Sequence, residues 1–125
     1  MATAADIPAM LEVFFHAIED LDQQRGRPLQ PRNAAPLEMH FGHLLQTDPH
    51  SCYVAEDHGR TIAFGVVMRR GVETYLSFLF VEPKWQNRRI GRAVYEACLA
   101  GVGEGVERHS VCAEANQPVS TGLYA

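Results

Sequence analysis

The sequence predicts a single mixed α/β domain, a central and mostly antiparallel sheet flanked by helices in the order α-α-β-β-β-α-β-α. Three observations lead to this prediction. Apolar residues recur at helical spacing before residue 47, the middle third is rich in Val, Ile, Phe and Tyr, and helical spacing returns after Pro83. The 125 residues suffice for one hydrophobic core and are too few for two, so one domain is expected over residues 1–125.

Two helices are expected before the strands. From Asp6 to Leu21 the apolar residues follow the 3.6-residue period, and Asp6 is the expected N-cap. Pro8 lies in the first turn, where its missing N–H costs nothing. Residues 22–36 hold one glycine and three prolines, which predicts a long surface loop. A second helix ends near Thr47 and has one apolar face, made of Leu37, Phe41, Leu44 and Leu45.

Three strands are expected in the middle of the chain, over residues 51–56, 61–69 and 73–81. The turn pairs His58-Gly59 and Arg70-Gly71 separate them, which predicts an antiparallel meander. The third strand carries apolar groups on both expected faces: Tyr75, Ser77, Leu79 and Val81 on one, and Leu76, Phe78 and Phe80 on the other. This strand should therefore be central, with helices over both faces of the sheet.

A third helix is expected after Pro83. Its apolar residues recur at helical spacing, and Gly101 marks its end. Residues 109–114 are then expected to form a short strand, and residues 118–125 the first turns of another helix.

The connection from the third strand to the third helix carries the chemical signal. Arg88, Arg89 and Arg92 fall at the start of the helix, where the helix dipole disfavours cations by about 0.3–1 kcal/mol each. Gly91 lies in the first turn and costs roughly 0.8–1 kcal/mol relative to alanine. Both features are explained if a phosphate binds here to free N–H and guanidinium groups, because a Cβ at Gly91 would intrude on it.

These residues resemble the nucleotide-binding motif of the GNAT superfamily of N-acetyltransferases, and the resemblance spans essentially the whole chain. The motif runs from a valine through a proline to Q/R-x-x-G-x-G/A, and its positions are matched by Val81, Pro83, Gln86 and Gly91. Arg89 stands in place of the first glycine, a replacement that fits if this residue has ordinary helical angles. The family's next motif is matched by Asn116, Ser120 and Tyr124.

The resemblance implies that acetyl-CoA is the cofactor. Its diphosphate would bind at the start of the third helix, and the backbone of the third strand would hold the pantetheine arm. The cofactor-binding residues implied in this way are Leu79, Phe80, Val81, Gln86, Asn87, Arg88, Arg89, Ile90, Gly91, Arg92, Ala93, Asn116 and Ser120.

The reaction implied by the resemblance is direct transfer of the acetyl group to a primary amine of a small molecule or peptide. Tyr124 would then be the general acid that protonates the departing thiol. The base that removes the amine's proton is expected to be Glu73, because it shares the predicted face of Leu79. Glu82 and Glu114, at strand ends, are the alternatives.

The composition argues against several other classes. A net charge of −4 disfavours a nucleic-acid-binding surface. No apolar run approaches the ~20 residues of a membrane span and no signal peptide is recognisable, so the cytoplasm is the expected compartment. The three cysteines lack C-x-x-C spacing and are expected to be reduced packing residues. His40 and His43 have metal-compatible spacing but no third ligand pattern, so no metal site is expected.

Members of the family usually have a strand before the first helix and a hairpin after the tyrosine-bearing helix. Neither is recognisable here, so we expect a domain fragment, a truncated product, or a protomer completed by a partner, such as a second copy in a homodimer. Three functions remain open: an N-acetyltransferase, an acyl-CoA-binding module without turnover, and an interaction domain without a ligand.

Overall fold

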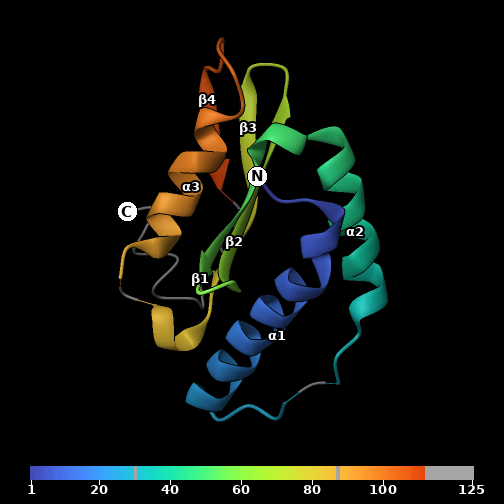
Figure 1. Cartoon of the computed structure of the whole chain (residues 1–125), viewed down its shortest axis with the longest axis vertical. Coiled ribbons are helices and arrows are strands. Elements are labelled where there is room, and N and C mark those ends of the chain that lie inside the picture. The colour runs from blue at the N-terminus through green and yellow to red at the C-terminus, as the bar shows by residue number, and fades with distance from the viewer. Residues whose placement is uncertain (30, 87, 112–125) are drawn as a thin grey trace.

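The computed structural model describes residues 1–29, 31–86 and 88–111 (Figure 1). Its elements follow the predicted order: η1 (Ala4–Asp6), α1 (Ile7–Gln24), α2 (Ala34–Thr47), η2 (Pro49–Ser51), β1 (Cys52–Asp57), β2 (Arg60–Arg70), β3 (Glu73–Val81), η3 (Pro83–Trp85), α3 (Ile90–Ala100) and β4 (Arg108–Val111). β4 covers the beginning of the strand predicted at 109–114, and the helix predicted at 118–125 lies outside the described residues.

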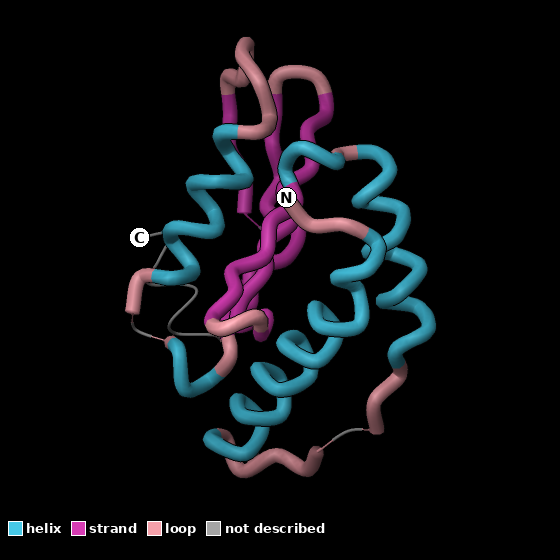
Figure 2. Tube along the Cα trace, viewed as in Figure 1, coloured by secondary structure: helices cyan, strands magenta, loops and turns pink. Residues whose placement is uncertain are grey.

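The four described strands form one mixed sheet in the order β1-β2-β3-β4. The first three pair antiparallel, as predicted, and β4 pairs parallel to β3. Parallel neighbours need a crossover connection, and α3 supplies it. Figure 2 shows α3 on one side of the sheet, with α1 and α2 on the other. The prediction of a central third strand covered on both faces is therefore confirmed.

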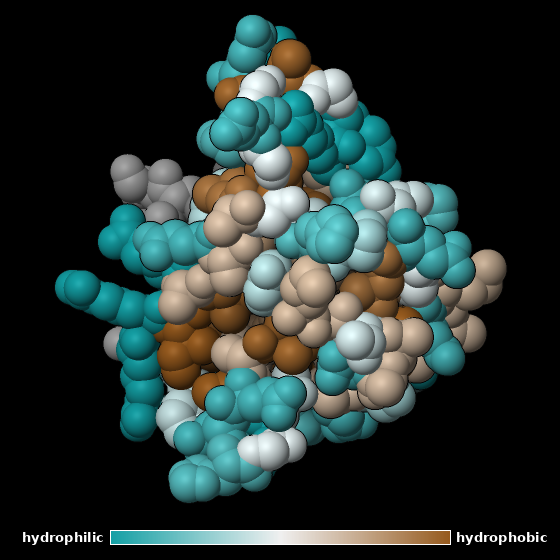
Figure 3. Space-filling model, turned by 45° about the horizontal axis from the view of Figure 1, so that its top comes forward, coloured by the Kyte–Doolittle hydropathy of each residue, from teal (hydrophilic) through white to brown (hydrophobic). Residues whose placement is uncertain are grey.

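Two hydrophobic clusters fill the space between the sheet and its helices. The cluster under α1 and α2 contains fully buried Met10, Phe41 and Phe64, and the two phenylalanine rings meet edge to face at 5.4 Å between centroids. The cluster under α3 consists of Ala63, Val67, Leu76, Leu79, Val94 and Cys98. β2 contributes to both clusters because its successive side chains point to opposite faces. On the face shown in Figure 3, hydrophobic residues gather towards the middle of the molecule.

A β-bulge at Ser77 changes the predicted faces of β3. Val66 of β2 pairs with Phe78, but the next residue, Val67, pairs with Leu76, so Ser77 is an extra residue. Leu76 consequently packs in the same cluster as Leu79, under α3. The predicted strict alternation along β3 is wrong for this reason: one inserted residue moves every side chain before it to the other face.

The same bulge separates Glu73 from Leu79. Counting back from Leu76, Glu73 and Tyr75 lie on the face towards α1 and α2, whereas Leu79 belongs to the cluster under α3. The predicted shared face of Glu73 and Leu79, on which the preference for this base depended, is therefore wrong.

The ends of the first two helices also differ from the prediction. Asp6 occupies the N-cap position of α1 as predicted, but its side chain makes no capping hydrogen bond to α1; its Oδ2 accepts hydrogen bonds from the Thr3 N–H at 2.8 Å and the Thr3 hydroxyl at 3.2 Å, which closes the η1 turn. The predicted loop 22–36 is shortened to residues 25–33, because α1 continues to Gln24 and α2 already begins at Ala34. Arg32 fastens this loop to α1 through its guanidinium contacts with Glu19 and Glu12.

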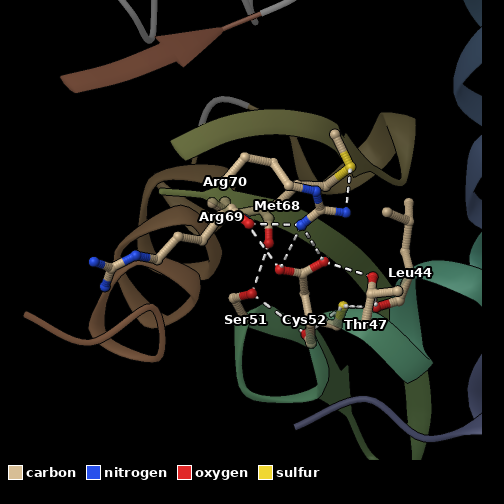
Figure 4. Close-up of polar contacts among 9 residues, drawn as sticks. Leu44, Thr47, Ser51, Cys52, Met68, Arg69 and Arg70 are labelled. Atoms are coloured by element: carbon tan, nitrogen blue, oxygen red, sulfur yellow. Dashed lines mark hydrogen bonds and ion pairs between the residues drawn. The ribbon is translucent and has the colours of Figure 1, made fainter. Parts of the chain in front are cut away.

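A buried carboxylate joins the end of α2 to β2. Asp48 accepts hydrogen bonds from the Arg69 N–H at 3.0 Å and from the Thr47 hydroxyl at 2.6 Å, and its Oδ2 lies 3.3 Å from Arg70 Nη1. Figure 4 shows Thr47 and Arg70 converging on this group from α2 and β2. Because a buried carboxylate without partners is costly, these bonds fix the connection that starts the sheet.

The end of α3 packs so closely against η2 that there is no room for a side chain at Gly101. A Cβ built on Gly101 would lie 1.5 Å from the backbone oxygen of His50. We expect Gly101→Ala to lower the free energy of unfolding by at least about 1–3 kcal/mol, because a backbone atom cannot yield as a side chain can. The matched control is Gly42→Ala in α2, where a Cβ meets no heavy atom within 4 Å. It should raise stability by roughly 0.5–1 kcal/mol. Urea denaturation measures both, and equal effects would contradict the predicted contact.

Candidate functional site

The connection from β3 to α3 is a tight, hydrogen-bonded turn. The Trp85 N–H donates to the Glu82 carbonyl at 2.8 Å, and the Gln86 N–H donates to the Pro83 carbonyl at 3.3 Å. The Gln86 side chain donates from Nε2 to the Val81 carbonyl at 3.2 Å. The glutamine of the sequence motif thus closes the turn itself, and these bonds fix where α3 begins.

The N-terminus of α3 gathers hydrogen-bond donors. The Ala93 N–H donates to the Arg89 carbonyl at 3.1 Å, so the amides of Ile90, Gly91 and Arg92 precede the first intrahelical bond. α3 is described in full, and its first turn contains no acidic residue that could accept from these amides. Donors of this kind, together with the positive end of the helix dipole, bind anions.

Two arginine side chains flank these amides. The Arg88 guanidinium lies over the Trp85 ring at 5.2 Å from its centroid, and Arg92 Nε lies 4.0 Å from Glu96 one turn further along α3. Arg88, Arg89 and Arg92 are all exposed. The described residues that the sequence assigned to phosphate binding therefore lie at or next to the N-terminus of α3.

Arg89 has the backbone conformation of a glycine. Its φ of 62° and ψ of 15° are left-handed, so the condition under which arginine fits in place of the motif's first glycine, ordinary helical angles, is not met. Side-chain sterics make this conformation unfavourable by roughly 1–2 kcal/mol for residues other than glycine. The turn imposes it because the chain must pass from η3 into α3 within four residues, 86–89.

The side chains of Leu79, Phe80 and Val81 are committed to the two hydrophobic clusters. The backbone groups of these three residues are not part of the clusters, and some of them lie on the edge of β3 that faces β4. The described pairing with β4 runs from Glu73↔Arg108 to Leu76↔Val111, so within residues 88–111 no strand pairs with β3 beyond Leu76. Beyond Leu76 the described residues record one contact to a main-chain group at this end of β3 from the α3 side of the turn, the bond from Gln86 Nε2 to the Val81 carbonyl.

Glu73 is held at the opposite end of β3 from this turn. Its Oε2 accepts a hydrogen bond from the Tyr75 hydroxyl, and its Oε1 lies 2.7 Å from Arg108 Nη2. A nine-residue strand at about 3.3 Å per residue puts Glu73 roughly 26 Å from Val81. Its role as the base stays a prediction, but in this structure one carboxylate oxygen contacts Tyr75 within β3 and the other contacts Arg108 of β4.

Glu82, the first alternative base, has a contact that the sequence did not indicate. Its side chain is only 6% exposed, and its Oε1 lies 2.7 Å from Nδ1 of His16 on α1. The other ring nitrogen, Nε2, lies 3.2 Å from Glu12. The only sequence signal was a carboxylate at the end of an apolar strand, because the partners are 66 residues apart.

Comparison with known proteins decides the family. The sequence model described as Acetyltransferase (GNAT) family matches residues 15–125. The chain belongs to the GNAT acetyltransferase family.

Solved structures share the GNAT fold at low sequence identity. A protein from Pyrococcus horikoshii, proposed to be an acetyltransferase, is 21% identical with a TM-score of 0.74 over 98% of this chain. The ribosomal-protein-S18-alanine N-acetyltransferase of Escherichia coli is 19% identical with a TM-score of 0.68, also over 98%. The PaiA N-acetyltransferase of Thermoplasma acidophilum, solved in complex with coenzyme A, is 12% identical with a TM-score of 0.76 over 98%.

This chain spans 39% of the length of the Pyrococcus protein, against 70% and 82% for the enzymes from Escherichia and Thermoplasma. The comparison with curated protein sequences gives no significant match.

Five residues that the sequence assigned to cofactor binding or catalysis lie outside the described residues: Asn87, Glu114, Asn116, Ser120 and Tyr124. Their roles remain predictions. Among residues that are described, the sequence interpretation missed His16 and the side-chain bond of Gln86, both of which act on the turn between β3 and α3.

Within residues 1–29, 31–86 and 88–111, the other reactive groups do not form a site. Cys52 and Cys98 are buried free thiols, and burial raises the pKa of each to about 12, so neither is a thiolate at neutral pH. The residues with described positions contain no group of three His, Cys, Asp or Glu side chains suited to a metal ion. His40 instead packs its ring against Phe78 at 5.4 Å. None of the helices in the described ranges is long and apolar enough to span a membrane.

The left-handed backbone of Arg89 predicts an unusual stabilising substitution. We expect Arg89→Gly to raise the free energy of unfolding by about 1 kcal/mol, because glycine adopts φ of 62° without steric cost. Arg89→Ala is the control: it removes the same guanidinium but keeps a Cβ, and should give no gain. Thermal unfolding without ligand measures both variants. A gain of the same size in both would attribute the effect to charge instead of backbone strain.

Proposed function

We propose that this GNAT chain binds acetyl-CoA and transfers its acetyl group to a primary amine. The observation that carries the proposal is the N-terminus of α3, where the amides of Ile90 to Arg92 and exposed arginines meet without an acidic residue in the helix's first turn. A diphosphate has the charge and the acceptor oxygens that this arrangement needs. Family membership and the coenzyme A complex of the Thermoplasma enzyme support the same ligand.

The thioester arm would lie along β3. Main-chain groups between Leu79 and Val81 face the side on which the described part of β4 gives no pairing. They could accept and donate hydrogen bonds to the amides of a pantetheine arm as a neighbouring strand would. N–H groups in the same row would polarise the thioester carbonyl and stabilise the negative charge that develops when the amine attacks.

Starting from the ammonium form, the transfer removes two protons from the nitrogen, one for the attack and one as the neutral amide forms, and donates one proton to the departing thiolate. An alkylamine with a pKa of about 10.4 is protonated at pH 7, which costs the attack about 4.6 kcal/mol. A carboxylate acting directly or through water would take this proton as the amine nitrogen bonds to the acetyl carbon. The carbon–sulfur bond then breaks, and Tyr124, assigned from the family motif, would protonate the thiolate of coenzyme A.

The acceptor is proposed only as an amine of a small molecule or a peptide. The Escherichia neighbour is named for an alanine of ribosomal protein S18, and another neighbour was solved with a bisubstrate analogue of coenzyme A and monomethyl-acetylneamine. One of these acceptors is a protein residue and the other a small molecule. At 19% and 18% identity the two enzymes share only their fold with this chain, so neither acceptor is assigned to it.

Binding is tested by thermal unfolding with coenzyme A and with pantetheine, which lacks the diphosphate. Coenzyme A at a hundredfold excess over Kd should stabilise the protein by about 2.7 kcal/mol, and pantetheine should not. Gly91→Leu should fold well, since leucine is the better helix former, but should lose the coenzyme A effect because its side chain occupies the phosphate position. Equal stabilisation by pantetheine, or an unchanged response in Gly91→Leu, would place the ligand elsewhere.

Turnover is tested by thiol release from acetyl-CoA in the presence of a panel of primary amines. We expect release with at least one amine, and a rate about 100-fold lower in Tyr124→Phe because a general acid contributes at least that factor. Tyr53→Phe on β1 is the control and should keep the wild-type rate. Stabilisation by coenzyme A without thiol release from any amine would favour the acyl-CoA-binding module.

A further inference from the structure

The residue that leads from β3 into the proposed phosphate turn is fixed at three points. The Glu82 N–H donates to the Ile62 carbonyl of β2 at 2.8 Å, and its own carbonyl accepts from the Trp85 N–H at 2.8 Å. Its side chain crosses to α1 and meets His16 at 2.7 Å. Glu82 therefore joins the sheet, the turn and the helix on the opposite face at a single residue.

The contact between Glu82 and His16 joins a carboxylate to an imidazole in a mostly buried place, and it is an ion pair when His16 is protonated. The side chains are 6% and 35% exposed, respectively. A carboxylate buried to this extent is strongly unfavourable unless a cation or several donors satisfy it. His16 also faces Glu12 through its second nitrogen at 3.2 Å. Only the imidazolium carries an N–H on both ring nitrogens, so the geometry suits the charged form.

Other charges around the pair are already matched. Arg32 bonds to Glu19 through Nε and Nη2, both at 2.8 Å, and lies 3.3 Å from Glu12 through Nη1. The hydrogen bond from Arg32 is the main reason why the pKa of Glu19 is lowered, and His16 contributes to this shift as well. Arg32 contacts Glu12 and Glu19 but not Glu82. Among these described groups, His16 is therefore the basic side chain that pairs with Glu82.

We propose that His16 and Glu82 are positioning residues that hold the turn from Pro83 to Arg89 in the geometry that binds the coenzyme A diphosphate. The inference rests on the proposed function for its ligand. The turn contains a left-handed Arg89, an unfavourable conformation that must be held in place by neighbouring contacts. The ion pair fixes the residue just before this turn from outside the sheet, so α1 supports a site formed by β3 and α3.

The experiment uses the full chain, one disrupting variant, one rescuing variant and one control. His16→Ala removes the cation, and His16→Lys keeps one within reach of Glu82. His58→Asn is the control: His58 is 94% exposed in the turn before β2, and its φ of 49° is one that asparagine tolerates. Because His16→Ala leaves a buried carboxylate unpaired and could unfold the chain, Glu82→Gln is measured beside it.

Two readouts are recorded for each variant. The first is the Kd for coenzyme A by calorimetry. The second is the hydrogen exchange, in the free protein, of three turn amides: those of Trp85 and Gln86, and that of Ala93, which donates to the last residue of the turn. We expect His16→Ala to raise the Kd for coenzyme A about tenfold and to speed hydrogen exchange at these amides about tenfold. Glu82→Gln should shift both readouts in the same direction. His16→Lys should restore both to within about threefold of wild type, and His58→Asn should leave them unchanged.

The outcomes separate this inference from the proposed function. If wild-type protein does not bind coenzyme A, the proposed function fails, and exchange at the three turn amides alone decides whether His16 and Glu82 position the turn. Unchanged exchange and Kd in both His16→Ala and Glu82→Gln would overturn the inference. Faster exchange spread equally over β2 and β3 would also overturn it, because that pattern reports general loss of stability.

Discussion

Burial of β2 and β3 on both faces is the constraint on which the rest of the structure depends. A strand whose two sides are both apolar cannot face water, so one layer of helix must cover each side. α1 and α2 pack on one face of the sheet and α3 packs on the other, and each face has its own hydrophobic cluster. Because α3 connects β3 to a parallel β4, its N-terminus must lie at the end of β3.

That placement generates the proposed anion site at little additional cost. A central strand delivers the chain directly to a helix start, where unpaired amides and the helix dipole favour a negative ligand. The short connection also forces Arg89 into a left-handed conformation. Strain of this kind persists only where surrounding contacts over-determine the backbone, and here the Gln86 side chain and the ion pair of Glu82 supply such contacts.

The two faces of the sheet are consequently coupled. The bulge at Ser77 places Leu76 under α3, while Phe78 and Phe80 beyond it pack in the cluster under α1 and α2. His16 extends this coupling to the turn between β3 and α3. If this turn binds the cofactor as proposed, changes in α1 would alter that binding without any contact between α1 and the cofactor.

The sequence by itself determined the class of fold, the order of the elements and the position of the turn between β3 and α3. These follow from local patterns, namely the periods of apolar residues and a strand–proline–glycine–helix motif, that depend on residues near one another in the chain. Only the tertiary structure decided the bulge at Ser77, the left-handed Arg89 and the pairing of His16 with Glu82. Each of these arises from contacts between segments far apart in sequence, or from the path the chain must take between them, and no local pattern records such contacts.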